Sequence, residues 1–152
     1  MPCRWRDLVI WGAALGLAQP LQAQQIRELG VQAMATLSDP ALAVAGVYGA
    51  LRTRGRTRVS VSLSGGASGG EAAFRGELLA HFLLSPEAVH RPGFYLAGGV
   101  AGVEGKVDHG YVVLTAGVEQ EPGAPRGWAL ELGVGGGPRL SFGYRWRWFA
   151  GQ

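Results

Sequence analysis

Few side chains in this sequence could do chemistry, and they are spread along the chain. Histidine occurs at His81, His90 and His109, which lie too far apart to suggest the ligand set of a metal site. The single cysteine, Cys3, is close to the N-terminus and offers no disulfide partner. We therefore expect no metal and no other cofactor.

One combination of residues is typical of hydrolases. Asp108 and His109 are adjacent, and Ser64 or Ser68 on another loop could complete a group of the serine, histidine and aspartate type. This group requires the three side chains to converge in space. It defines an alternative, enzymatic hypothesis.

Positive charge is densest at Arg52, Arg54, Arg56 and Arg58. These arginines could form an ordinary solvated hairpin, or they could contact anionic lipid head groups. The net charge of the whole chain is only +3, so we expect no nucleic-acid partner.

The elements that would position these side chains are short and rich in turn residues. Glycine makes up 26 of the 152 residues, and glycine and proline interrupt the chain at regular intervals. The hydrophobic content of 47% argues against a disordered glycine-rich chain. The turn signals predict one all-β domain with eight strands, at 26–37, 41–53, 56–65, 71–85, 93–104, 109–120, 126–136 and 139–149. Most of these segments are close to the roughly 9–11 residues that a tilted strand needs to cross a bilayer.

The last segment alternates with a period of two, as a strand does. Its polar or small side carries Ser141, Gly143, Arg145 and Arg147. The residues of its other side are all large and apolar or aromatic, and they are Leu140, Phe142, Tyr144, Trp146 and Trp148. Tryptophan and tyrosine are enriched at membrane interfaces, so this side is expected to face lipid.

This segment resembles the closing strand of the small bacterial outer-membrane β-barrels, a family that includes the barrel domain of outer membrane protein A and outer membrane protein X. Proteins of this family end on an aromatic residue, whereas Ala150, Gly151 and Gln152 follow Phe149 here. The resemblance implies an eight-stranded antiparallel up-and-down transmembrane barrel in a Gram-negative outer membrane, with both termini in the periplasm. It also implies outer-membrane lipid, periplasmic chaperones and the barrel assembly machinery as partners. The assembly signal would be Tyr144, Trp146, Trp148 and Phe149.

The N-terminal residues predict export from the cytoplasm. Arg4 and Arg6 precede an apolar run at 8–18, and Leu21-Gln22-Ala23 suits a signal peptidase. The apolar run is only about half of what a membrane-spanning helix needs, so an N-terminal anchor is the weaker alternative. We expect a cleaved signal peptide at 1–23, which would remove Cys3, and a barrel domain at 24–152.

Alternation in the other segments assigns residues to the two faces of the barrel wall. The residues expected to face lipid or form aromatic girdles are Phe74, Phe82, Tyr95, Trp128, Leu140, Phe142, Tyr144, Trp146 and Trp148. The charges expected in the lumen are Glu28, Arg58, Arg75, Glu77, Glu131, Arg145 and Arg147. An eight-stranded barrel has room only for its own side chains, so these charges must pair with one another. The segments 41–53 and 93–104 are rich in small residues on both faces, and their register is not assigned.

One feature departs from the family pattern. Outer-membrane barrels have short periplasmic turns, yet the presumed periplasmic connections at 85–92 and 121–125 are among the longest, after a loop expected at 64–70. Short outer loops also argue against an adhesin or receptor.

These observations favour a monomeric outer-membrane barrel with a structural or surface role, a polar plugged interior, no wide channel and no catalysis. Two alternatives stay open. A soluble periplasmic barrel that binds an apolar ligand would turn its aromatics inward. A barrel enzyme that modifies envelope lipid would bring Asp108, His109 and a serine together, although no motif of such enzymes is recognised here.

Overall fold

The computed structural model describes residues 26–53, 55–105 and 108–149, all of which belong to one closed antiparallel barrel. Its strands are β1 (Ile26–Thr36), β2 (Leu42–Arg52), β3 (Thr57–Ser68), β4 (Glu71–Leu83), β5 (Gly93–Glu104), β6 (His109–Glu119), β7 (Arg126–Val134) and β8 (Pro138–Phe149). The predicted signal peptide at 1–23 lies outside the described residues. No helix in the described part of the chain is long and apolar enough to span a bilayer.

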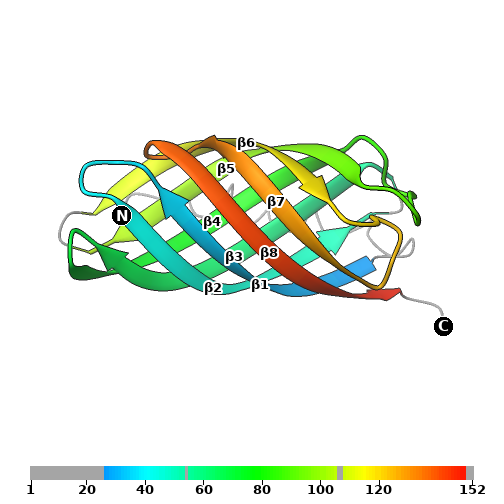
Figure 1. Ribbon diagram of the computed structural model, residues 1–152, viewed down its shortest axis with the longest axis horizontal. Coiled ribbons are helices and arrows are strands. Elements are labelled where there is room, and N and C mark those ends of the chain that lie inside the picture. Colours follow the sequence, from blue (N-terminus) through cyan, green and yellow to red (C-terminus); the bar gives the residue numbers. More distant parts are fainter. Residues whose placement is uncertain (1–25, 54, 106–107, 150–152) are drawn as a thin grey trace, which may run out of the picture.

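Each strand pairs with its neighbours in sequence, and β8 returns to β1 to close the sheet (Figure 1). The closing register places Ile26 opposite Phe149 and Thr36 opposite Arg139. The strands are steeply tilted, as closure of a small number of strands requires. The prediction of an all-β, eight-stranded antiparallel barrel is therefore confirmed.

The connection between β3 and β4 differs from the prediction. The glycine-rich segment 64–70 was expected to be a long loop, but β3 continues to Ser68, which pairs with Glu71. Only Gly69 and Gly70 form the turn, with φ angles of 58° and 85°. Two consecutive positive φ angles are the requirement of a type I′ hairpin turn, and glycine meets it without steric cost.

The connections divide between two ends of the barrel. The connections from β2 to β3, from β4 to β5 (84–92) and from β6 to β7 (120–125) start and finish at the end where β1 starts and β8 finishes, which we call the termini end. The segments 37–41, 69–70 and 135–137 lie at the opposite, distal end, where β5 finishes and β6 starts. The two longest connections, 84–92 and 120–125, are therefore both at the termini end.

The structure also gives the two registers that the sequence left unassigned. In β2, Leu42, Val44 and Arg52 are buried inside the barrel, while Val47 and Leu51 are exposed outside it. In β5, the buried residues are Tyr95, Ala97 and Ala101, and the exposed ones include Phe94, Leu96 and Val100.

Candidate functional site

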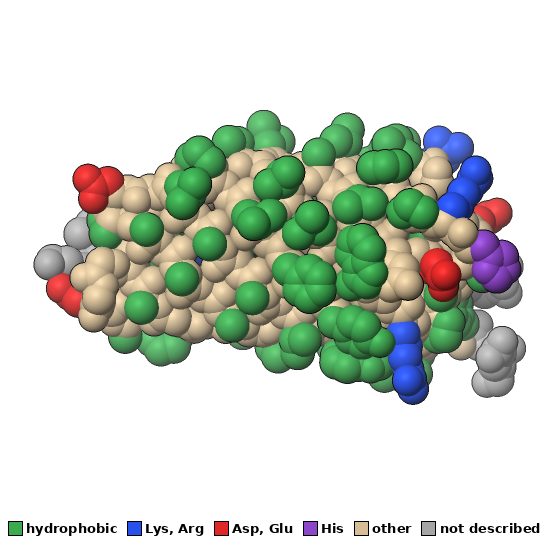
Figure 2. Space-filling view, viewed as in Figure 1, with side chains coloured by type: hydrophobic (Ala, Val, Ile, Leu, Met, Phe, Trp, Pro, Cys, Tyr) green, Lys and Arg blue, Asp and Glu red, His purple; other side chains and the backbone are tan. Residues whose placement is uncertain are grey.

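The outer wall of the barrel is apolar along its whole length. On the face seen in Figure 2, hydrophobic side chains cover the body of the molecule and charged side chains lie toward its two ends. Every strand contributes exposed apolar residues, among them Leu29, Val31, Val47, Leu51, Val59, Val61, Leu63, Leu78, Leu96, Val100, Val112, Leu114, Leu132 and Val134. A soluble monomer rarely exposes an apolar patch of more than a few hundred Å². Here the patch continues around the barrel.

All but one of the residues expected to face lipid lie on this outer wall. They are Phe74, Phe82, Trp128, Leu140, Phe142, Tyr144, Trp146 and Trp148. The rings of Tyr144 and Trp146 pack edge to face with centroids 5.2 Å apart, and Trp128 is the cross-strand neighbour of Tyr144. Phe149, which was expected to end the assembly signal, is also exposed, at the last position of β8.

The basic residues next to these aromatics lie at the termini end. Arg27 pairs with Trp148 across the β1–β8 seam, and Arg126 pairs with Trp146 across β7 and β8. Both arginines are exposed. Aromatic rings beside basic side chains suit the interface between hydrocarbon and head groups.

The assignment of Tyr95 to the lipid-facing set was wrong. Tyr95 is 1% exposed and points into the lumen, because its neighbour Phe94 occupies the outward position of the pleat. The ring of Tyr95 lies over Gly117, where a Cβ would come within 2.6 Å of it. Its hydroxyl donates to Glu131 Oε1 at 2.7 Å.

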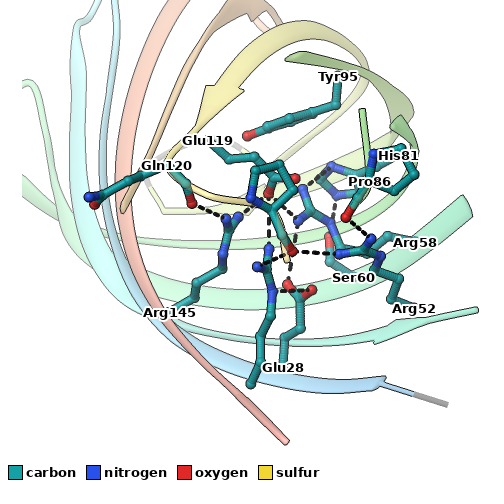
Figure 3. A network of polar contacts seen from close by, with 12 residues as sticks. Glu28, Arg52, Arg58, Ser60, His81, Pro86, Tyr95, Glu119, Gln120 and Arg145 are labelled. Carbon is teal, nitrogen blue, oxygen red and sulfur yellow. Dashed lines mark hydrogen bonds and ion pairs between the residues drawn. The ribbon is translucent and has the colours of Figure 1, made fainter. Parts of the chain in front are cut away.

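The lumen holds a buried charge cluster near the termini end, built on Glu28 and Glu119 (Figure 3). Arg58 Nη1 lies 2.9 Å from Glu119 Oε2 and 3.4 Å from Glu28 Oε2. Arg147 reaches Glu28 Oε1 through Nε at 2.8 Å and Glu119 Oε2 through Nη2 at 3.2 Å. Arg145 also pairs with Glu119. We call these five residues the termini-end cluster.

A second set of ion pairs crosses the middle of the lumen. Glu77 Oε1 accepts from Arg75 Nε and from Arg139 Nη1, each at 2.7 Å. Arg139 Nη2 lies 3.4 Å from Glu131 Oε2, which also accepts from the Ser141 hydroxyl at 3.1 Å. We call Arg75, Glu77, Glu131 and Arg139 the mid-barrel cluster. Between the two clusters lies a cavity of only about 40 Å³, enough for very few waters.

The structure thus brings all seven predicted lumen charges inside the barrel, together with four more residues that were not in the predicted set. These are Arg52, His81, Glu119 and Arg139. The alternation of residues along β6 and β8 indicates the inward orientation of two of them. Glu119 lies on the same face as Thr115, and Arg139 lies on the same face as Ser141. Arg52 lies in a strand whose register the sequence did not determine.

His81 is held between Arg58 and Ser60 in the lumen. Arg58 Nη2 is 3.1 Å from Nδ1, and Ser60 Oγ is 2.8 Å from Nε2. A guanidinium can only donate, so Nδ1 accepts and the ring proton sits on Nε2, which donates to the serine hydroxyl. Both ring nitrogens are therefore engaged in the packing of the lumen.

The two longest connections at the termini end make hydrogen bonds with arginines of the lumen. Pro122 is fully buried, and Arg52 Nη1 donates to its carbonyl at 2.9 Å. The second amino group of Arg52 donates to the Pro86 carbonyl. Arg147 donates to carbonyls of the same loop, including that of Ala124 at 3.0 Å. We call the segment 120–125 the plug loop.

The balance of buried charges explains why arginines of the lumen bind backbone carbonyl groups of the plug loop. The buried arginines are Arg52, Arg58, Arg75, Arg139, Arg145 and Arg147, and the glutamates that face them are Glu28, Glu77, Glu119 and Glu131. Arginine exceeds glutamate, and a buried cation needs an acceptor. The carbonyl oxygens of the plug loop supply acceptors to Arg52, Arg145 and Arg147. The long connections at the termini end therefore have a structural reason.

Among the described residues, Asp108, His109 and Ser64 each make contacts other than those of a catalytic triad. Asp108 Oδ1 accepts from the backbone N–H of Gly105 at 3.4 Å, and the His109 ring stacks on Tyr111 with centroids 5.8 Å apart. Ser64 Oγ accepts from Gln32 at 3.4 Å inside the lumen. Within the described ranges, no group of three or more His, Cys, Asp or Glu side chains could hold a metal ion.

Ser68 is the central residue of a Gly-x-Ser-x-Gly pattern at 66–70. In α/β-hydrolases that pattern forms a sharp turn between a strand and a helix. Ser68 instead ends β3 and is followed by the hairpin turn to β4. It lines the same distal cavity as His109, and the pattern has no nucleophile-elbow geometry here.

Comparison with known proteins gives structural neighbours only. No protein-family model matches the sequence, and no curated protein is significantly similar to it. The N-terminal β-barrel domain of Pseudomonas aeruginosa OprF superimposes with a TM-score of 0.64 at 10% identity, covering 80% of this chain and 97% of that domain. Neisserial surface protein A gives a TM-score of 0.49 at 12% identity, covering 84% of this chain and 98% of the neisserial one. At such identities the likeness to OprF shows the fold alone.

Proposed function

We propose that this chain is a small integral protein of the bacterial outer membrane, a monomeric barrel with a structural or surface role. The observation that carries the proposal is the orientation of the side chains, which is the reverse of that in a soluble protein. Apolar residues of all eight strands face outward, while the buried charges face inward. Water would make such an exterior unstable in a monomer, whereas bilayer hydrocarbon is its natural solvent.

The backbone supports the same placement. A bilayer core offers no hydrogen-bond partners, so a spanning sheet must close on itself. Here every strand pairs on both sides, and β8 pairs with β1 along its length. The strands are 9 to 13 residues long, close to the roughly 9–11 that a tilted strand uses to cross the hydrocarbon.

The distribution of exposed charge adds a third argument. Exposed basic residues at the termini end are Arg27, Arg56, Arg91 and Arg126, and exposed acidic residues at the distal end are Asp39, Glu71, Glu104 and Asp108. The apolar wall between the two rims has the form of a transmembrane band.

The interior supports a closed barrel. Two buried ion-pair clusters cross the lumen, and the plug loop covers the termini end. The cavity between the clusters is only about 40 Å³, which supports a lumen filled by its own side chains. The outward aromatics count against the alternative of a soluble barrel with an apolar ligand inside, because that protein would turn them inward.

Cell fractionation combined with a heat-shift gel tests this proposal. We expect the protein in the outer-membrane fraction, with an unboiled sample that migrates differently from a boiled one. Protein found in the soluble periplasm, with the same mobility before and after boiling, would overturn the proposal. Planar bilayers containing the purified protein should show no ion conductance, and a steady conductance would contradict the closed interior.

A further inference from the structure

The distal end of the barrel opens into a cavity of about 450 Å³. This volume lies in the range of about 300–1,000 Å³ that is typical of small-molecule sites. The connections on this side are mostly short, and the cavity is lined by residues of the inner face of the wall and by residues of the distal connections.

One wall of the distal cavity is apolar. Leu42, Ala73 and Val103 line it, and Met34 and Val44 pack against them from within the lumen. The four core members of this set are 1–5% exposed. An apolar wall at the mouth of an otherwise charged lumen favours the apolar part of a ligand over water.

The floor of the cavity offers hydrogen-bond donors. Arg75 is 1% exposed and donates through Nη1 and Nη2 to the Gly135 carbonyl, both at 3.2 Å, and through Nε to Glu77. A guanidinium has five N–H groups, so two of them have no partner among the described residues. Gly135, which receives these bonds, itself lines the cavity.

Thr36 provides an independent second observation. It lines the cavity, is 2% exposed, and its hydroxyl has no hydrogen-bond partner within the described part of the chain. A buried hydroxyl without a partner is costly, and native structures contain few of them. A ligand that carries an acceptor group could offer a partner to this hydroxyl or to Arg75.

The charges around the distal cavity indicate which polar head group a ligand would carry. Arg75 and Arg139 are balanced by Glu77 and Glu131, so the floor is neutral as a whole and presents N–H and O–H donors. Asp39 lies at the rim of the cavity and disfavours several negative charges. We propose that the distal cavity binds a small amphipathic molecule whose head is a single carboxylate or a carbonyl group and whose short apolar tail lies on Leu42, Ala73 and Val103.

The test uses the full-length protein refolded in lipid nanodiscs, with methyl-labelled leucine and valine observed by NMR. The probes share a six-carbon chain and differ in their heads: hexanoate, hexanamide and hexylammonium. We expect a saturable shift of the Leu42 methyls with hexanoate, hexanamide or both. The Leu114 methyls on the outer wall report partition into lipid in the same sample.

Two threonine variants form a matched pair. Thr36→Val should weaken binding about tenfold, because it removes the donor while keeping the shape. Thr115→Val removes another buried hydroxyl without a partner that does not line the cavity, and it should leave the affinity unchanged. Neither change should impair folding, since each replaces an unsatisfied hydroxyl by a methyl, and the heat-shift gel checks this.

Three results would overturn the inference. The first is the absence of saturable shifts at Leu42 with hexanoate and hexanamide. The second is binding of hexylammonium that is as tight as that of the other two probes. The third is an equal loss of affinity in Thr36→Val and Thr115→Val. These results concern the barrel interior alone, so they leave the proposed membrane location untouched.

Discussion

Arg147 and Glu28 form a buried ion pair across the seam where β8 meets β1, with Nε and Oε1 2.8 Å apart. Both side chains are fully buried, and the two residues are direct cross-strand neighbours. The pair therefore joins the first and the last strand of the barrel from inside. Glu28 also pairs with Arg58, so one carboxylate serves two guanidinium groups.

We predict that Glu28→Gln destabilises the folded barrel by about 3–5 kcal/mol, because it leaves the charges of Arg58 and Arg147 short of a buried partner. The free energy of unfolding by urea in phosphatidylcholine vesicles, followed by tryptophan fluorescence, measures the effect. Glu87→Gln is the matched control, since Glu87 is exposed in the connection 84–92. Equal stability of the two variants would contradict a role for the seam pair.

The apolar wall leads to a second prediction. Leu114 is 59% exposed near the middle of β6. Leu114→Arg should lower the free energy of unfolding in vesicles by about 2–4 kcal/mol, because it places a charge near the bilayer midplane. Val89→Arg, in a connection outside the strands, should change it by less than about 0.5 kcal/mol. A protein that does not span a membrane would tolerate both changes alike.

The sequence predicted the strands well where both faces had distinct chemistry. In β8, arginine and aromatic residues alternate, so the period of two determined both the strand and its orientation. The prediction failed at the end of β3, where glycine, alanine and serine resemble a loop. There the pairing with β4 extends the strand, and only Gly69 and Gly70 carry the positive φ angles of a turn.

The errors in the site have a tertiary origin. Phe94 and Tyr95 are adjacent aromatics in a strand rich in small residues, so composition does not decide which of them faces inward. Gly117 on β6 decides it, because only a glycine leaves room for the Tyr95 ring. The role of the plug loop could not be predicted from the sequence either, since its contacts with Arg52 and Arg147 join residues far apart in the chain.

The C-terminal aromatic residue leads to a third prediction, which rests on the family resemblance. Phe149→Ala should reduce the amount of heat-shifted protein in the outer membrane several-fold, because the assembly machinery would lose its signal. The same variant should refold in detergent as well as the wild type, since Phe149 is partly exposed at the end of β8. Phe142→Ala, in the body of β8, is the control for loss of an outward ring. A refolding defect equal to the cellular defect would instead indicate a structural role for Phe149.

The plug loop leads to the last prediction. Arg52→Met keeps much of the apolar stem of the side chain but removes the donors to the Pro122 and Pro86 carbonyls. The loop would then be held by fewer bonds, and its local opening should become more frequent. The amide of Gly123, which donates to the Ala88 carbonyl at 3.0 Å, reports that opening through hydrogen exchange. We expect its exchange to become about tenfold faster, which corresponds to a loss of about 1.4 kcal/mol, while the amide of Val113 in β6 is unchanged.

Arg56→Met is the matched control, because Arg56 is exposed at the same end of the barrel. It should leave the exchange of Gly123 unaffected. Arg52→Met should still show no conductance in planar bilayers, because the mid-barrel cluster crosses the lumen independently of the plug loop. Unchanged exchange at Gly123 in Arg52→Met would mean that the guanidinium does not hold the loop. Conductance in that variant would mean that the plug loop, rather than the ion pairs of the lumen, keeps the barrel closed.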